Sequence, residues 1–197
     1  MKRIIIASII MLLPACAGVK ATYTKPAEAN SPEYDRTVDA SFDKTWNALI
    51  DYASSNFFSI DNYEKDSGLM TLSFGAGNPE TYIDCGRWDA EWTNPQNYQR
   101  QSFHGSYIRY IQQAVTTTFT GKMNITVREV TPEKTRVRVN ARYILASAEG
   151  NTWSFDSGSS STVSVNNPTQ GISAYRTCRP TYAAEKAILS AIDELSQ

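Results

Sequence analysis

The chain has 197 residues, of which 41% are hydrophobic and 11% aromatic, enough apolar material for one ordinary domain with tails. Its 19 lysines and arginines nearly balance 20 aspartates and glutamates, which excludes the strong positive field typical of nucleic-acid binders. One histidine and three cysteines leave little material for transition-metal sites, so we expect neither a metal nor a cofactor.

The N-terminus has the pattern of an export signal. Lys2 and Arg3 precede an apolar run from Ile4 to Leu13, which is shorter than the roughly 20 residues of a membrane-spanning helix. The sequence Leu13-Pro14-Ala15-Cys16 resembles the lipobox of bacterial lipoproteins, in which the cysteine thiol receives a diacylglyceryl group and the chain is cut just before it. This resemblance implies a signal peptide over residues 1–15 and a lipid anchor on Cys16. An ordinary secretory signal with an incidental cysteine is the alternative.

The segment after Cys16 carries further information about location. In lipoproteins of the enterobacterial type, an aspartate directly after the lipidated cysteine retains the protein in the inner membrane, and here that residue is Ala17. The resemblance therefore implies an outer-membrane lipoprotein that faces the periplasm. Residues 16–35 have no apolar periodicity and contain two prolines, which predicts a flexible tether.

The remaining two cysteines form an even pair. Removing a lipidated Cys16 from the count leaves Cys85 and Cys178 in an exported, oxidising setting. We expect a disulfide between them, and two buried free thiols are the alternative.

We expect residues 36–197 to form a single periplasmic domain. Ser41 is a good N-cap for an amphipathic helix from Phe42 to about Phe57, whose apolar residues share one face. A second amphipathic helix is predicted from Tyr182 to Leu195. Short β-rich runs with polar turns predict the strands, which cover these ranges: 37–40, 58–63 with 69–74 around a Gly68 turn, 123–127 with 137–143, and a pair around Trp153 and Val163.

This order predicts an α+β fold with an antiparallel sheet and the N-terminal and C-terminal helices packed on one face. The sequence from Val38 to Trp46, together with Asp66-Ser67-Gly68-Leu69-Met70, resembles the helix-grip domains of lipoproteins such as the C component of the β-barrel assembly machine. The resemblance covers about 35 residues and the closing helix, and it implies a helix-grip-like arrangement.

Residues 75–110 combine irregular patterning with many aromatics. We expect an irregular segment pinned by Cys85, with Trp88, Trp92 and Tyr98 as a partner surface, because aromatics with a polar edge suit protein interfaces. For any one of these aromatics taken alone, a flap packed on the sheet is the favoured interpretation, and it is favoured less strongly for Trp88 and Trp92 together. Binding hot spots are expected at the two tryptophans.

A basic row is predicted on the polar face of one strand. Arg136, Arg138 and Arg142 alternate with buried positions, and such a row could meet anionic lipid or lipopolysaccharide. A merely solvated strand face is the favoured interpretation.

The sequence contains none of the common hydrolase, phosphate-loop, zinc-protease or dithiol motifs. His104 could act as a general base, and Asp84, Asp89 and Glu91 could supply paired carboxylates, but solvated surface groups are the favoured interpretation of both. We therefore expect no catalytic residues and a binding or assembly module whose partner is another envelope protein. A carrier of a small molecule or lipid and a cell-wall hydrolase are the alternatives.

Overall fold

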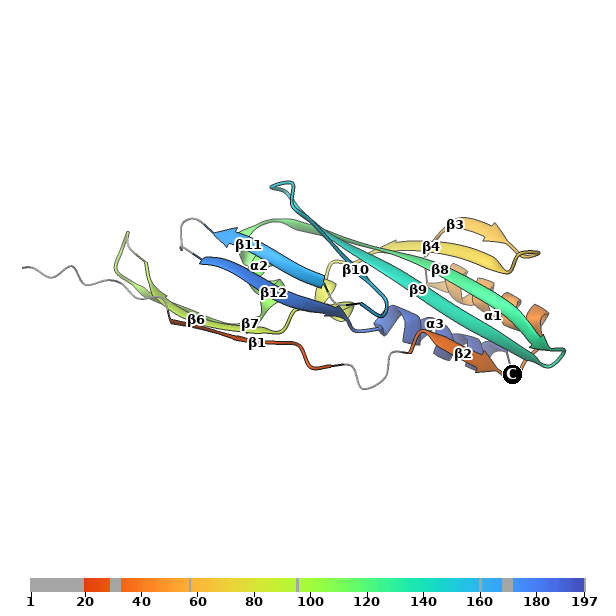
Figure 1. Cartoon of the computed structure of the whole chain (residues 1–197). Coiled ribbons are helices and arrows are strands. Elements are labelled where there is room, and N and C mark those ends of the chain that lie inside the picture. The colour runs from red at the N-terminus through yellow and green to blue at the C-terminus, as the bar shows by residue number, and fades with distance from the viewer. Residues whose placement is uncertain are drawn as a thin grey trace, which may run out of the picture.

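The computed structural model describes residues 20–28, 33–56, 58–94, 96–159, 161–167 and 172–196. The predicted signal peptide and the predicted lipidation site Cys16 lie outside these ranges. The protein is elongated, and the long strands β8 and β9 run through much of its length (Figure 1). The helices and strands have the following bounds: β1 Lys20–Thr24, β2 Asp35–Val38, α1 Phe42–Ser55, β3 Ser59–Glu64, β4 Leu69–Gly75, η1 Pro79–Thr81, β5 Ile83–Asp84, β6 Arg87–Thr93, β7 Arg100–Ser106, α2 Tyr107–Ala114, β8 Thr117–Thr131, β9 Lys134–Ser147, β10 Thr152–Asp156, β11 Ser161–Asn167, β12 Ile172–Pro180 and α3 Ala183–Leu195.

A six-stranded antiparallel sheet forms the larger half of the fold. Its order is β10-β9-β8-β4-β3, and β2 pairs with the end of β9 that β10 leaves free. Side chains alternate strictly along β9, so that Val137, Val139 and Tyr143 are buried while the arginines between them are exposed. One face of this sheet is therefore apolar and the other polar.

The two predicted helices cover the apolar face. Ser41 caps α1 by accepting the N–H of Lys44 at 3.4 Å, as its position predicted. Trp46 and Leu49 of α1 meet Ile188 and Ile192 of α3 in one fully buried cluster against the sheet. The predicted α+β class, with antiparallel strands and helices at both ends of the strand series, is confirmed.

The turn between β3 and β4 follows the sequence prediction closely. Gly68 has a φ of 60°, and a Cβ at this position would lie 2.2 Å from the carbonyl oxygen of Val127. Only glycine combines this left-handed backbone with so close an approach to the neighbouring strand. The hairpin is therefore fixed both by its turn and by its contact with β8.

The smaller half of the fold differs from the sequence prediction. Residues 75–110 are not irregular, because they contain β5, β6, β7 and α2. The segment lacks a readable period because its sheet, ordered β1-β6-β7, buries only short stretches such as Trp88, Ala90 and Phe103. Its polar strands alternate, but glycines and amides mask the pattern.

The predicted flexible tether is wrong for residues 20–24. They form β1, which pairs antiparallel with β6 from Lys20 opposite Glu91 to Thr24 opposite Arg87. Tyr23 anchors this strand by donating its hydroxyl to the backbone carbonyl of Thr177 at 2.9 Å. A short polar strand of this kind gains its order from a partner strand distant in sequence, which local patterning does not reveal.

The predicted strand pair around Trp153 and Val163 is also wrong. β10 pairs with β9 and not with β11, and β11 pairs with β12 in a separate three-stranded sheet that ends on β5. None of the helices in the described ranges combines the length and apolar character needed to cross a bilayer.

The predicted disulfide between Cys85 and Cys178 is present, and both cysteines are buried. It joins the loop between β5 and β6 to β12, two segments separated by 93 positions in the chain. The bridge thus connects the sheet of β6 to the strand that leads directly into α3.

We expect the double variant Cys85→Ser, Cys178→Ser to unfold in urea with a free energy lower by about 4 kcal/mol, since the bridge closes a long loop. The double substitution avoids a reactive lone thiol. A Ser67→Ala variant in the exposed β3/β4 turn serves as a control and should stay within about 0.5 kcal/mol of wild type. Equal stability of the double variant and the wild type would show that the bridge does not constrain the unfolded chain.

Candidate functional site

The polar face of the six-stranded sheet is the clearest candidate for a binding surface. A pocket of about 410 Å³ lies on this polar face. It lies on β8 and β9 and at the end of β10, and its lining residues are Lys122, Asn124, Asn140, Ala141, Arg142, Asp156 and Ser157. The pocket therefore opens on the face that α1 and α3 do not cover.

Charges around the pocket are arranged as neighbouring ion pairs. Lys122 and Arg142 are directly opposite each other on β8 and β9. Lys122 contacts the carboxylate of Asp61 at 3.1 Å, and Arg142 donates its Nε to Asp156 Oδ1 at 2.6 Å. The two adjacent cations are thus each paired with a carboxylate from a different strand, Asp61 of β3 or Asp156 of β10. The amide residues Asn124 and Asn140 form the next opposite pair but one along β8 and β9.

The three arginines of the predicted basic row lie on this same face. Arg136 and Arg138 both donate to Asp35 of β2, with Nε of Arg136 2.8 Å from Oδ1 and Nε of Arg138 3.0 Å from Oδ2. Arg142 is paired with Asp156 and not with Asp35. The row therefore carries less net positive charge than the sequence alone indicates, because each arginine has a carboxylate partner.

Hydrogen bonding to these arginines changes the titration of Asp35. The hydrogen bond from Arg136 is the largest effect and lowers the pKa of the Asp35 carboxyl below its ordinary value. Burial opposes it, and the hydrogen bond from Arg138 adds a smaller lowering. The Asp35 side chain is 21% exposed, so it holds the edge strand β2 to β9 while remaining close to water.

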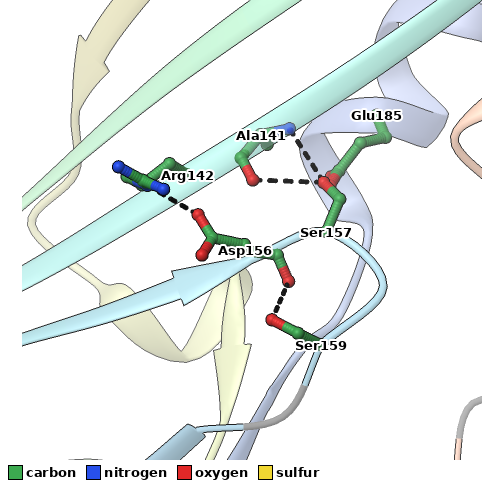
Figure 2. Close-up of polar contacts among 6 residues, drawn as sticks. All are labelled: Ala141, Arg142, Asp156, Ser157, Ser159 and Glu185. Carbon is green, nitrogen blue, oxygen red and sulfur yellow. Dashed lines mark hydrogen bonds and ion pairs between the residues drawn. The ribbon is translucent and has the colours of Figure 1, made fainter.

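Figure 2 shows a polar network around Ser157, which is also one of the residues that line the pocket. Ser157 follows β10, and its Oγ accepts the backbone N–H of Ala141 at 2.8 Å and donates to Glu185 Oε1 at 2.6 Å. The backbone N–H of Ser157 in turn donates to the carbonyl of Ala141 at 2.9 Å. Ser157 thus extends the pairing of β10 with β9 by one residue and links the open face to α3 on the other side.

Glu185 is the buried acidic residue at the centre of this network. It is fully buried in the first turn of α3, and its second carboxylate oxygen accepts the hydroxyl of Tyr143 at 2.6 Å. Burial, reinforced by the adjacent carboxylate, raises the pKa of the Tyr143 hydroxyl far above its ordinary value, so this hydroxyl remains a donor. Both oxygens of this buried side chain therefore accept a hydroxyl hydrogen bond.

The expected partner surface of Trp88, Trp92 and Tyr98 divides into three environments. Trp88 is only 4% exposed and belongs to the core, so the prediction that it is a surface hot spot is wrong. Trp92 is partly buried and packs against the same core. Tyr98 is 84% exposed at the end of the β6/β7 hairpin, and it alone has the exposure that the prediction requires.

Trp88 is buried because a cation from β12 covers it. The guanidinium of Arg176 lies 4.5 Å from the ring centroids of Trp88 and Tyr23 and 5.5 Å from that of Tyr107. Burial raises the pKa of Tyr107 to about 12, so its ring presents a neutral hydroxyl to this cluster. These aromatics therefore hold β1, β6 and α2 to β12, which is a structural role.

His104 and the acidic residues of the same region lie on the strands β6 and β7 or next to them. His104 Nδ1 is 3.1 Å from Asp89 Oδ1, and Arg87 donates to the same carboxylate. Asp84 accepts the backbone N–H of Gly86 at 2.7 Å, and Glu91 is exposed. The hydrogen bond from Arg87 and the smaller effect of that from His104 lower the pKa of the Asp89 carboxyl, so Asp89 is a paired surface carboxylate.

Among the residues in the described ranges, no group of three or more histidine, cysteine, aspartate and glutamate side chains is placed to hold a metal ion. Sequence reasoning missed Lys122, Ser157 and Glu185. Lys122 was visible as a polar position in the strand alternation, whereas the contact between Ser157 and Glu185 joins segments whose spatial relation only the fold reveals. The chain matches no protein-family model and no curated protein. Function has to be inferred from its own residues.

We expect Tyr143→Phe to lower the free energy of unfolding by about 1–3 kcal/mol, because it leaves a buried carboxyl oxygen of Glu185 without its hydrogen-bond donor. Tyr98→Phe is the matched control, since that hydroxyl is on an exposed ring, and should change stability by less than about 0.5 kcal/mol. Urea denaturation of both variants decides the comparison. Equal losses would mean that Tyr143 does not stabilise the Glu185 carboxylate.

A second prediction concerns the dependence of stability on pH. The pKa of Asp35 is lower in the folded state, so Asp35 of the unfolded chain takes up a proton first as the pH falls. The contribution of Asp35 to the free energy of unfolding is therefore complete above about pH 4 and is lost as the pH falls further. We expect Asp35→Asn to be less stable than wild type by about 1 kcal/mol at pH 7, with the difference shrinking toward pH 3. Asp51→Asn, on an exposed face of α1, is the control. A wild-type advantage over Asp35→Asn that is the same at both pH values would contradict the assignment.

Proposed function

We propose that the protein is a lipid-anchored envelope protein that faces the periplasm from the outer membrane and acts as a non-enzymatic binding or assembly module. The export signal and the lipobox-like Leu13-Pro14-Ala15-Cys16 support the anchor. The disulfide supports an oxidising compartment, since buried bridges of this kind persist outside the cytosol.

The observation that carries the binding role is the uncovered polar face of the six-stranded sheet. Its apolar face is occupied by α1 and α3, while the other face presents an ordered array of charges and amides around the pocket. Polar side chains that are held in place by neighbours lose little conformational entropy when a partner binds. This face is therefore suited to another envelope protein with complementary charge.

A small polar ligand is the second candidate, because the pocket is large enough for one and is lined with donors and acceptors. The cleft between the closing helix and the sheet offers less room, since Trp46, Leu49, Ile188 and Ile192 fill it without exposed area. A ligand of this protein would on this proposal bind the sheet face and not the space under α3.

The anchor is tested by growth with labelled palmitate. Wild type should incorporate the label and Cys16→Ala should not, because the thiol is the acceptor. Equal labelling of the two, including none in either, would overturn the lipid anchor.

The binding face is tested by a paired substitution. We expect Lys122→Gln, Arg142→Gln to lose co-purification with the envelope partner, while its melting temperature stays near that of wild type because exposed ion pairs contribute only about 0–1 kcal/mol each. The control Lys44→Gln, Lys186→Gln removes the same charge from exposed positions on α1 and α3 and should keep the partner. Retention of the partner by both variants would exclude this face, and an extractable small molecule without protein would favour the ligand.

A further inference from the structure

The position of β1 limits how far the folded body can lie from the proposed lipid. Cys16 precedes Lys20 by four positions, a distance that the chain spans with at most about 14 Å even when fully extended. Lys20 is already paired with Glu91 of β6. A lipid on Cys16 therefore holds this part of the fold close to the membrane surface.

The strand direction shows which end of the fold comes closest. β1 is antiparallel to β6, so the chain preceding Lys20 approaches from the side of Trp92 and Thr93, where β6 turns into β7. The hairpin extends beyond the Lys20–Glu91 pair by three strand and loop residues to Asn94, which is roughly 10 Å at the rise of a β-strand. Measured from the Lys20–Glu91 pair, the end of the hairpin and the proposed anchor on Cys16 are therefore at comparable distances. Figure 1 places this hairpin at one end of the elongated molecule.

Tyr98 is the prominent side chain of the hairpin tip, which we define as residues 92–94 and 96–101. It is the most exposed of the large hydrophobic side chains described, at 84%, and its backbone is left-handed with a φ of 58°. Hydrogen bonds within the loop hold this conformation, including the N–H of Tyr98 to the carbonyl of Asn94 at 2.8 Å and the N–H of Asn94 to the carbonyl of Gln99 at 2.9 Å. The backbone that carries Tyr98 is thus held in place by hydrogen bonds, and the Tyr98 side chain is exposed.

The chemistry of the hairpin tip fits a lipid headgroup layer. It contains amide side chains, two aromatics and Arg100, and no acidic residue. Tyrosine and tryptophan are enriched where an apolar ring meets a hydrated headgroup, and a positive side chain favours anionic lipid.

We propose that the hairpin tip is a membrane-contacting element, with the Tyr98 ring inserted among the headgroups of the leaflet that holds the Cys16 lipid. This inference rests on the proposed lipid anchor. The anchor and the ring then act as two attachment points, so that the six-stranded sheet extends away from the membrane with its polar face accessible.

The test uses the full lipidated protein in vesicles of phosphatidylethanolamine and phosphatidylglycerol, with and without a lipid brominated near the headgroup. Tyr98→Trp should show emission that is shifted to shorter wavelength and quenched by the brominated lipid, relative to the wild-type chain. Tyr63→Trp, at a half-exposed position on β3 in the other half of the fold, is the matched control and should show no added quenching. Melting temperatures near that of wild type confirm that both variants are folded.

Flotation with Cys16→Ala separates the two ways of failing. If wild type floats no better with the vesicles than Cys16→Ala does, the lipid anchor and the tip contact fall together. If wild type floats and Cys16→Ala does not, yet the tryptophan at position 98 is no more quenched than the one at position 63, the anchor stands and the membrane contact of the hairpin tip is overturned.

Discussion

The buried carboxylate of Glu185 fixes the closing helix to the rest of the fold. A carboxyl group in an apolar core is costly unless hydrogen-bond donors meet it, and here the donors come from Tyr143 of β9 and from Ser157 after β10. Sliding α3 by one residue would place an alanine or a lysine opposite these hydroxyls, so the network determines the register of the helix as well as its stability.

The same segment holds the two halves of the protein together. Strand β12 leads into α3 with only two residues between them, and it carries Arg176 and Cys178. Arg176 lies among the aromatic rings of β1, β6 and α2, and Cys178 is bonded to Cys85 ahead of β6. One continuous stretch of chain is thus attached to the smaller half by a cation and a disulfide and to the larger half by a buried carboxylate. These attachments are of three different chemical kinds, and all of them lie in the stretch of chain from Arg176 to Glu185.

Local periodicity was sufficient to predict much of the larger half. The apolar face of α1, the glycine turn before β4 and the alternation of β8 and β9 each encode their structure within a few neighbouring residues. Which strands pair with each other could not be predicted in the same way. The pairing of β10 with β9 and of β11 with β12 depends on the three-dimensional arrangement of the strands and not on local patterns. The disulfide was predictable because counting cysteines needs no geometry.

In the candidate site, too, local features could be predicted from the sequence, whereas those that depend on distant segments could not. The arginine row could be located on a strand face from alternation alone, but its charge state could not, because Asp35 and Asp156 come from other strands. Trp88 was misjudged because an aromatic in a polar segment has the same sequence signature whether it faces water or a buried cation. The decisive residue was Arg176, which is distant in the chain and lies against the Trp88 ring.

The strand β1 shows how a weak local pattern can have a large consequence. Its five residues include three with small or hydroxyl side chains beside Lys20, and a composition of this kind specifies a strand poorly. Its order comes instead from the ladder with β6 and from the Tyr23 ring, which packs against Tyr107 with a centroid distance of 6.1 Å and receives the Arg176 guanidinium. An aromatic residue in an otherwise polar strand thus replaces a freely moving linker with a fixed direction of approach. The direction in which the chain enters the fold at Lys20 is then set by the register of β1 on β6.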